Sequence, residues 1–163
     1  MQKSTVRSIL RENAWQLVMY ALGIALCALW HWALALVYIL LCGVSNILFM
    51  KWVCPYCAHY GMGTCKAGFH ILSGGRFKPT PGRTFGQQFR RFVIVMVPGW
   101  LIPPLIGILL LVDHFSWPVL ILLGLFCLVG FVILPKDARR HCEDCPMMDC
   151  PRRPKKLLQI DRK

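Results

Sequence analysis

The sequence predicts an all-α integral membrane protein with four transmembrane helices, arranged as two hairpins with a small cysteine-rich cytoplasmic cap. Three observations lead to this fold class: four long apolar runs without Lys, Arg, Asp or Glu, basic residues confined to three places, and a group of cysteines after each pair of runs. Apolar residues make up 56% of the 163 positions and gather in these runs, whereas a soluble core would disperse them.

Each apolar run is long enough to cross a bilayer. A transmembrane helix needs about 20 apolar residues, with a lower limit of about 17. In lipid, a helix satisfies the hydrogen bonds of its backbone N–H and C=O groups within the span itself. We therefore expect one transmembrane hairpin over residues 14–50 and a second over residues 92–134. Their helices are predicted at Ala14–Trp30, Ala33–Met50, Phe92–Val112 and Trp117–Leu134.

Residues 1–13 are predicted to form an amphipathic segment on the membrane surface. Val6, Ile9 and Leu10 share one side of a helix, and basic residues lie on the other, where each gains about 1 kcal/mol from anionic lipid. The first apolar run passes into the second without a small-residue cleavage site. We therefore expect a retained helix and not a cleaved signal peptide.

The basic residues predict the topology. All 19 Lys and Arg lie before the first run, between residues 51 and 91, or after Leu134, and the two opposite turns have none. Positive charge in short flanks stays cytoplasmic, so both termini should be inside the cell. The cytoplasmic side then holds a cysteine-rich basic loop, residues 51–91, and a cysteine-rich basic tail, residues 135–163.

The net charge of +12 does not predict nucleic-acid binding. Residues 66–91 do alternate basic and aromatic side chains, as single-strand binding proteins do. This stretch is flanked by predicted membrane spans, however, so lipid headgroups are the expected partner.

Six of the nine cysteines form two groups at equivalent points of the two halves. Cys54 and Cys142 are 88 residues apart, and so are Cys57 and Cys145. The C-x-x-C spacing lets two thiolates bind one centre, and grouped cytosolic cysteines indicate metal or redox chemistry because the cytosol keeps thiols reduced. The predicted metal ligands are Cys54, Cys57, Cys65, Cys142, Cys145 and Cys150, with His59 and His141 able to complete a site.

The predicted cofactor is one or two iron–sulfur clusters, with zinc as the alternative. Three thiolates per group suit iron–sulfur clusters, whereas a single tetrahedral zinc site would use two from each group and leave two cysteines unused. Two zinc sites, each completed by a histidine, also remain open. Cys145-Pro146 and Cys150-Pro151 resemble the Cys-Pro that closes bacterial ferredoxin runs, and this resemblance implies an iron–sulfur cofactor.

Two further functions would use the cysteines differently. Residues 54–57 read Cys-Pro-Tyr-Cys, which is similar to glutaredoxin active sites and implies thiol exchange. In that family the motif follows a strand of a thioredoxin-like fold, which the predicted helices do not supply. Soft-metal transport would use Cys27, Cys42 and Cys127 as relay ligands, although a lone cysteine in an apolar helix is more often a packing residue.

The third predicted helix contains Pro98, Pro103 and Pro104. Proline removes a backbone hydrogen bond and kinks a helix, and we expect this bend to border a pocket for a quinone. The sequence thus predicts an iron–sulfur electron-transfer subunit that links a cytosolic redox partner to quinone. A zinc-stapled membrane scaffold is the alternative, and no acid–base pair or activated nucleophile predicts hydrolysis.

Overall fold

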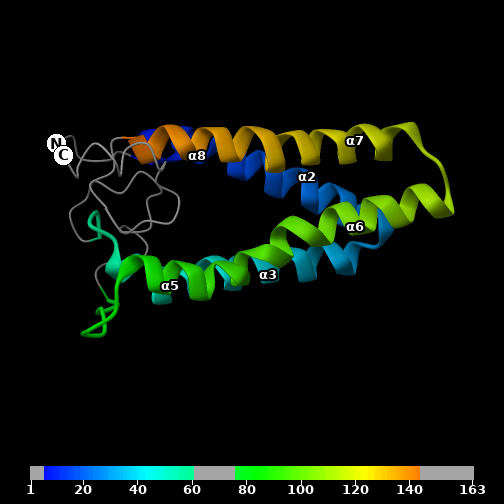
Figure 1. Cartoon of the computed structure of the whole chain (residues 1–163). Helices are drawn as coiled ribbons and strands as arrows, with labels where there is room; N and C mark the ends of the chain where they lie inside the picture. The colour runs from blue at the N-terminus through cyan, green and yellow to red at the C-terminus, as the bar shows by residue number, and fades with distance from the viewer. Residues whose placement is uncertain (1–5, 61–75, 144–163) are drawn as a thin grey trace. The chain divides into compact units, whose positions relative to one another are not determined.

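The computed structural model describes residues 6–60 and 76–143, which form helices and contain no strand (Figure 1). The all-α prediction is confirmed for this part of the chain. In chain order the elements are α1 (Val6–Glu12), α2 (Ala14–Trp30), α3 (Trp32–Trp52), the 3-10 turn η1 (Cys54–Tyr56), α5 (Phe85–Phe92), the 3-10 segment η2 (Val93–Met96), α6 (Val97–Asp113), α7 (Trp117–Cys127), the π-helical segment η3 (Leu128–Ile133) and α8 (Leu134–Glu143).

Within the described residues, three continuous helical stretches are long and apolar enough to span a membrane. They cover Trp32–Tyr56, Phe85–Asp113 and Trp117–Arg139, with 25, 29 and 23 residues. The first predicted span is present with its predicted bounds as α2, but its 17 residues rise only about 26 Å, slightly less than the ~30 Å hydrocarbon layer. The structure therefore shows three helices of membrane length, and the four-span arrangement stays a prediction.

The chain divides into two compact units. The helical unit comprises Ala14–Ile47 and Val95–Pro135, and the cysteine unit comprises Met1–Asn13, Leu48–Ile94 and Lys136–Lys163. Each of the three long helical stretches passes from one unit into the other.

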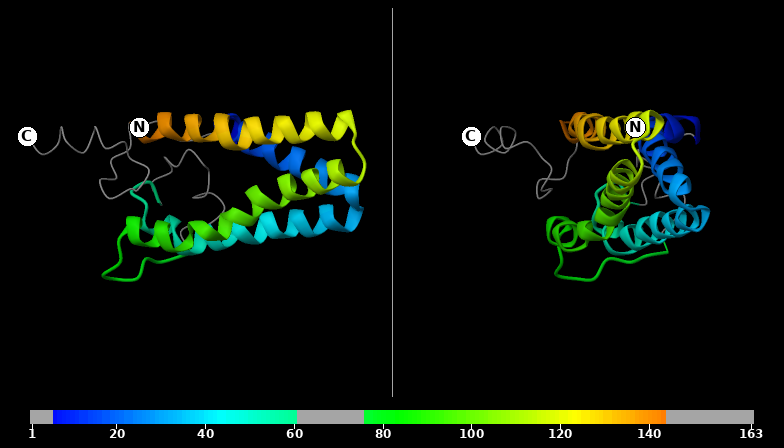
Figure 2. Two further views of the ribbon diagram at one scale, coloured as in Figure 1. Left: turned by 45° about the vertical axis from the view of Figure 1, so that its right-hand side comes forward. Right: turned by 90° about the vertical axis from the view of Figure 1, so that its right-hand side faces the viewer.

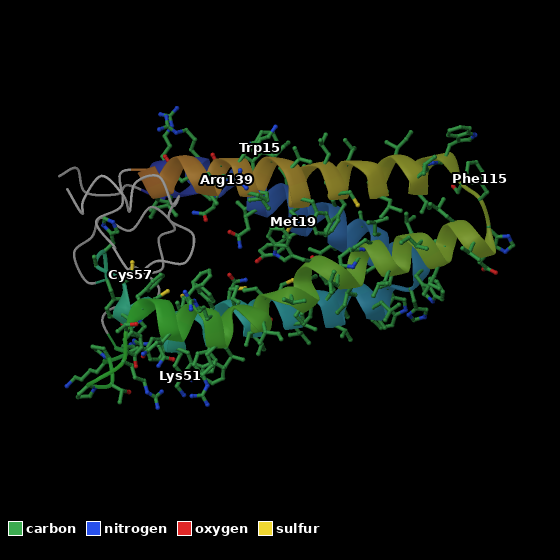
Figure 3. The ribbon with its side chains drawn as sticks, in the orientation of Figure 1. Trp15, Met19, Lys51, Cys57, Phe115 and Arg139 are labelled. Atoms are coloured by element: carbon green, nitrogen blue, oxygen red, sulfur yellow. The ribbon has the colours of Figure 1, made fainter. Side chains whose placement is uncertain are left out.

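The helical unit has two groups of buried residues at its core. Its α2 packs against α6 and α7, which also pack against each other (Figures 1 and 2). One group is centred on Met19 and Phe126, both fully buried, and Figure 3 shows the Met19 side chain among these helices. The other joins α2 to α3 through Cys27, Tyr38 and Cys42.

Polar side chains within the helical unit find hydrogen-bond partners. The Tyr38 hydroxyl donates to the carbonyl oxygen of Gly99 at 2.8 Å. The Tyr20 hydroxyl accepts from the side-chain amides of Gln16, at 2.8 Å, and Asn46, at 3.0 Å. Such bonds hold helices together where an unsatisfied polar group would face an apolar environment.

The second of the long stretches begins earlier than predicted. Residues 85–91, expected in the loop, are helical as part of α5. The helix starts at a capping box, in which the Thr84 hydroxyl accepts from the Gln87 N–H at 3.4 Å and the Gln87 side chain accepts from the Thr84 N–H at 3.3 Å. The sequence carries this signal as T-x-x-Q, so the start of the helix could have been predicted.

Proline is accommodated differently in the last two stretches. The α6 helix continues through Pro103 and Pro104, and Pro98 lies in its first turn, directly after η2. In the last stretch the π-helical segment η3 precedes Pro135. Proline has no N–H to donate and its ring crowds the residue four positions before it, so the wider π-helical turn fits this position.

Candidate functional site

The first C-x-x-C pair forms a tight turn directly after α3. The Val53 N–H donates to the carbonyl oxygen of Phe49 at 2.9 Å, and the Cys57 N–H donates to the carbonyl oxygen of Cys54 at 3.0 Å. The second bond closes a four-residue turn, in which the Cα atoms of the two cysteines lie within about 7 Å of each other. Pro55 is buried inside this turn. The fold therefore brings the first two predicted ligands together, and Figure 3 shows Cys57 in this turn.

A second turn follows and carries His59. The Tyr60 N–H donates to the carbonyl oxygen of Cys57 at 3.0 Å, and Cys54, Cys57 and His59 are all partly buried. Among the residues that the structure describes, no group of three or more His, Cys, Asp or Glu side chains could hold a metal ion. A metal centre at these turns would therefore need ligands from beyond the described residues.

The second cysteine group lies at the end of α8 and beyond it. His141 and Cys142 are in the last turn of this helix, whereas Cys145, Cys150 and also Cys65 lie outside the described residues. Residues 136–143 of α8 belong to the same compact unit as residues 54–60. The described members of both predicted ligand groups are thus in one unit.

Two tyrosines connect the cysteine turns to the segment that precedes α5. The Tyr56 hydroxyl accepts from the Thr80 N–H at 3.0 Å, and the Tyr60 hydroxyl accepts from the Phe77 N–H at 3.2 Å. Tyr56 lies between Cys54 and Cys57 in sequence, so this segment is tied to the C-x-x-C turn itself.

Aromatic pairs join the end of α3 to α5 in the same unit. The ring centroids of Trp52 and Phe92 are 4.6 Å apart, and those of Phe49 and Phe89 are 5.9 Å apart and edge-on. Both separations suit favourable aromatic contacts, each worth about 0.5–1.5 kcal/mol beyond the area that it buries. The end of α3, which leads into the C-x-x-C turn, is therefore packed against α5 through aromatic side chains.

The predicted quinone region lies in α6. Pro103 is buried, and Pro98 and Pro104 are partly buried. Two pockets found among the described residues are lined by residues of the cysteine unit and not by these prolines. The quinone site therefore stays a prediction.

The cysteines inside the helices are distributed over two places. Cys27 and Cys42 are buried in the same core group with Tyr38, and both are free thiols. Cys127, in α7, is partly buried and is not a member of that group. Two of the three suggested relay ligands are thus neighbours, and each of these two also has a packing role.

Sequence patterns did not reveal a pocket of about 460 Å³ next to the C-x-x-C turn. Its lining comes from the end of α3, from the segment before α5 and from α5, and Tyr56 is part of it. The basic and aromatic residues were evident in the sequence, but only tertiary packing assembles segments so far apart.

Comparison of this chain with protein-family models, with curated proteins and with solved structures finds no match.

Proposed function

We propose that this chain is an integral membrane protein whose two cysteine groups bind a metal at the cytoplasmic surface for electron transfer. The observation that carries the proposal is the closed C-x-x-C turn at the end of a 25-residue apolar helix, in the same compact unit as the start of the second cysteine group. Two thiolates held this close would form half of a four-sulfur site.

The surface of the helical unit supports a membrane location. Large apolar side chains are exposed along its helices, including Leu40 at 68% and Val112 at 79%. Exposed aromatic residues lie at the two turns without basic residues, where Phe115 and Trp117 have ring centroids 5.3 Å apart and Trp32 is 68% exposed. Aromatic side chains prefer the membrane interface, so these turns would lie on the side opposite the cysteines.

The proposed metal is iron, in one or two iron–sulfur clusters. The ligands would be the six grouped cysteines, with His59 or His141 completing a site. Lys51, near the end of α3, is exposed and lies three residues before Cys54. Its positive charge would offset part of the thiolate charge. Such clusters carry out electron transfer, and nearby hydrogen bonds and charges set their potential. The protein would exchange electrons with a cytosolic redox partner and with quinone beside Pro98, Pro103 and Pro104.

Anaerobic purification followed by metal analysis and a visible spectrum tests this function. We expect bound iron with acid-labile sulfide and a brown colour, both lost when Cys54 and Cys57 are replaced by Ala. The matched control replaces Cys27 and Cys127 by Ala, which removes two thiols outside the groups and should leave iron in place. A colourless protein with stoichiometric zinc would favour the zinc-stapled scaffold, and a protein without iron or zinc would contradict metal binding.

A further inference from the structure

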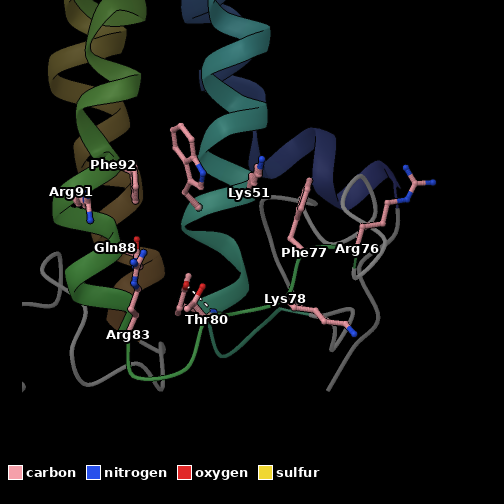
Figure 4. A pocket seen from close by; sticks show the side chains of 11 residues that line it. Lys51, Arg76, Phe77, Lys78, Thr80, Arg83, Gln88, Arg91 and Phe92 are labelled. Atoms are coloured by element: carbon pink, nitrogen blue, oxygen red, sulfur yellow. Dashed lines mark hydrogen bonds between the residues drawn. The ribbon is translucent and has the colours of Figure 1, made fainter.

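The pocket beside the C-x-x-C turn is lined by several cations. Its volume of about 460 Å³ is that of an ordinary ligand site. Among the described residues, no Asp or Glu lines it, and none of its cations forms an ion pair with an acid. Their charge is therefore not neutralised there. The cations among its described lining residues are Lys51, Arg76, Lys78, Arg83 and Arg91 (Figure 4).

A buried amide in the wall of this pocket has no hydrogen-bond partner among the described residues. Gln88 is 4% exposed and lines the pocket from α5, close to Arg83 and Phe92 (Figure 4). Its backbone N–H donates to the Thr84 carbonyl oxygen at 3.2 Å, but its side-chain amide makes no hydrogen bond within residues 6–60 and 76–143. Buried polar groups are nearly always hydrogen-bonded, and an exception calls for a missing partner. A ligand in the pocket would supply it.

The arginines of the pocket are also suited to donate. The Tyr56 hydroxyl is already bonded to Thr80, whose backbone N–H donates to it at 3.0 Å and whose side chain is a second partner. The Arg91 guanidinium lies 5.5 Å from the centroid of the Phe92 ring, a cation–π contact that limits its positions. The pocket therefore presents positive charge and hydrogen-bond donors, and it suits a compact anion with several acceptor oxygens.

We propose that this pocket binds a phosphate group. The fork of a guanidinium matches two phosphate oxygens, and lysine adds a point charge. The amide of Gln88 lies too deep for a large acidic surface and would donate to an oxygen that enters the pocket. The same chemistry is offered by the headgroup of an anionic phospholipid and by a soluble phosphate. The inference does not depend on the proposed metal centre, because none of the predicted metal ligands that the structure describes lines the pocket.

Binding of inorganic phosphate to the detergent-purified full chain tests the proposal. In titration calorimetry we expect the double substitution Arg83→Gln and Arg91→Gln to weaken binding by at least tenfold, since it removes two charge-assisted contacts. Gln88→Leu removes the amide without a change of charge and should weaken binding severalfold. Arg90→Gln is the matched control, because Arg90 is the neighbour of Arg91 on α5 and does not line this pocket.

Nanodiscs distinguish the two sources of phosphate. The chain is reconstituted in phosphatidylcholine with or without phosphatidylglycerol, and the lipid retained after extraction is counted by native mass spectrometry. Retention of phosphatidylglycerol that falls in the Arg83/Arg91 variant but not in Arg90→Gln identifies a lipid headgroup. Phosphate binding without such retention identifies a soluble ligand.

The proposal is wrong if the wild type binds neither probe, or if Arg90→Gln weakens binding as much as the double substitution. Circular dichroism and a single elution peak establish that the variants are folded, and Gln88→Leu provides a test without any change of charge.

Discussion

The hydroxyl of Tyr56 accepts a hydrogen bond from the backbone N–H of Thr80 at 3.0 Å. This bond ties the segment before α5 to the C-x-x-C turn. Thr80 is exposed, so water can replace the lost acceptor in Tyr56→Phe, and we expect a loss of only about 0.5–1 kcal/mol of stability. Hydrogen exchange at the Thr80 amide should nevertheless become faster. Tyr60→Phe is the control, which should affect Phe77 instead, and unchanged exchange at Thr80 in Tyr56→Phe would show that the bond does not hold this segment.

Gly23 is predicted to be essential for close packing in the helical unit. A Cβ atom at this position would lie 2.6 Å from the hydroxyl oxygen of Tyr38 and 2.8 Å from two of its ring carbons. Tyr38 is buried and hydrogen-bonded to Gly99, so it cannot move away freely. Overpacking costs about 1–3 kcal/mol, and most of this range lies above the helix-propensity gain of about 1 kcal/mol from Gly to Ala.

The melting temperature in detergent measures this effect. Gly23→Ala should lower it, whereas Gly124→Ala should leave it unchanged or raise it, because a Cβ atom at Gly124 meets no atom within 4 Å. Equal melting temperatures for the two variants would contradict the packing described at Tyr38.

Tyr20 and Asn46 are expected to be energetically coupled. The Asn46 side-chain amide bridges the Tyr20 hydroxyl and the Cys42 carbonyl oxygen, at 3.0 and 2.8 Å. Interhelical hydrogen bonds in membranes are worth about 0.6 kcal/mol on average and reach about 1.7 kcal/mol. A double-mutant cycle of Tyr20→Phe and Asn46→Ala, read from unfolding in detergent, should give a coupling energy in this range. Additive effects would show that the bond contributes nothing measurable.

The proposed topology can be tested with substituted cysteines. A membrane-impermeant maleimide added to intact cells should label His31→Cys and Phe115→Cys, at the two turns without basic residues. It should label Lys136→Cys and Gln87→Cys only after the cells are broken. The full chain without substitution sets the background from its own thiols. Labelling of Lys136→Cys in intact cells, with protection of both turns, would reverse the topology.

Local sequence signals were sufficient for much of the fold. The apolar run Ala14–Trp30 has the bounds of α2, because a charged flank and the aromatic turn at His31 limit it on both sides. The capping box of Thr84 and Gln87 was equally local, and it marks the start of α5. The π-helical segment before Pro135 could not be predicted, since an apolar run has the same composition whether its backbone bonds span four residues or five.

The candidate site could be predicted only in part, because part of it depends on contacts between segments that are distant in sequence. The C-x-x-C spacing predicts that Cys54 and Cys57 share one site, and in the structure both lie in one hydrogen-bonded turn. The pocket beside it depends on bringing Lys51, Arg76 and Arg91 together from separate segments, and neither periodicity nor spacing encodes such contacts. The burial of the Gln88 amide is likewise visible only in the packed structure.

X-ray absorption at the metal edge of the anaerobically purified full chain tests the central claim most directly. The claim is that grouped cysteines hold the metal, so the account predicts a bound metal, iron first and zinc as the alternative, whose nearest ligands are mainly sulfur at about 2.3 Å. A first shell of oxygen and nitrogen, or a protein that retains no metal, would contradict it.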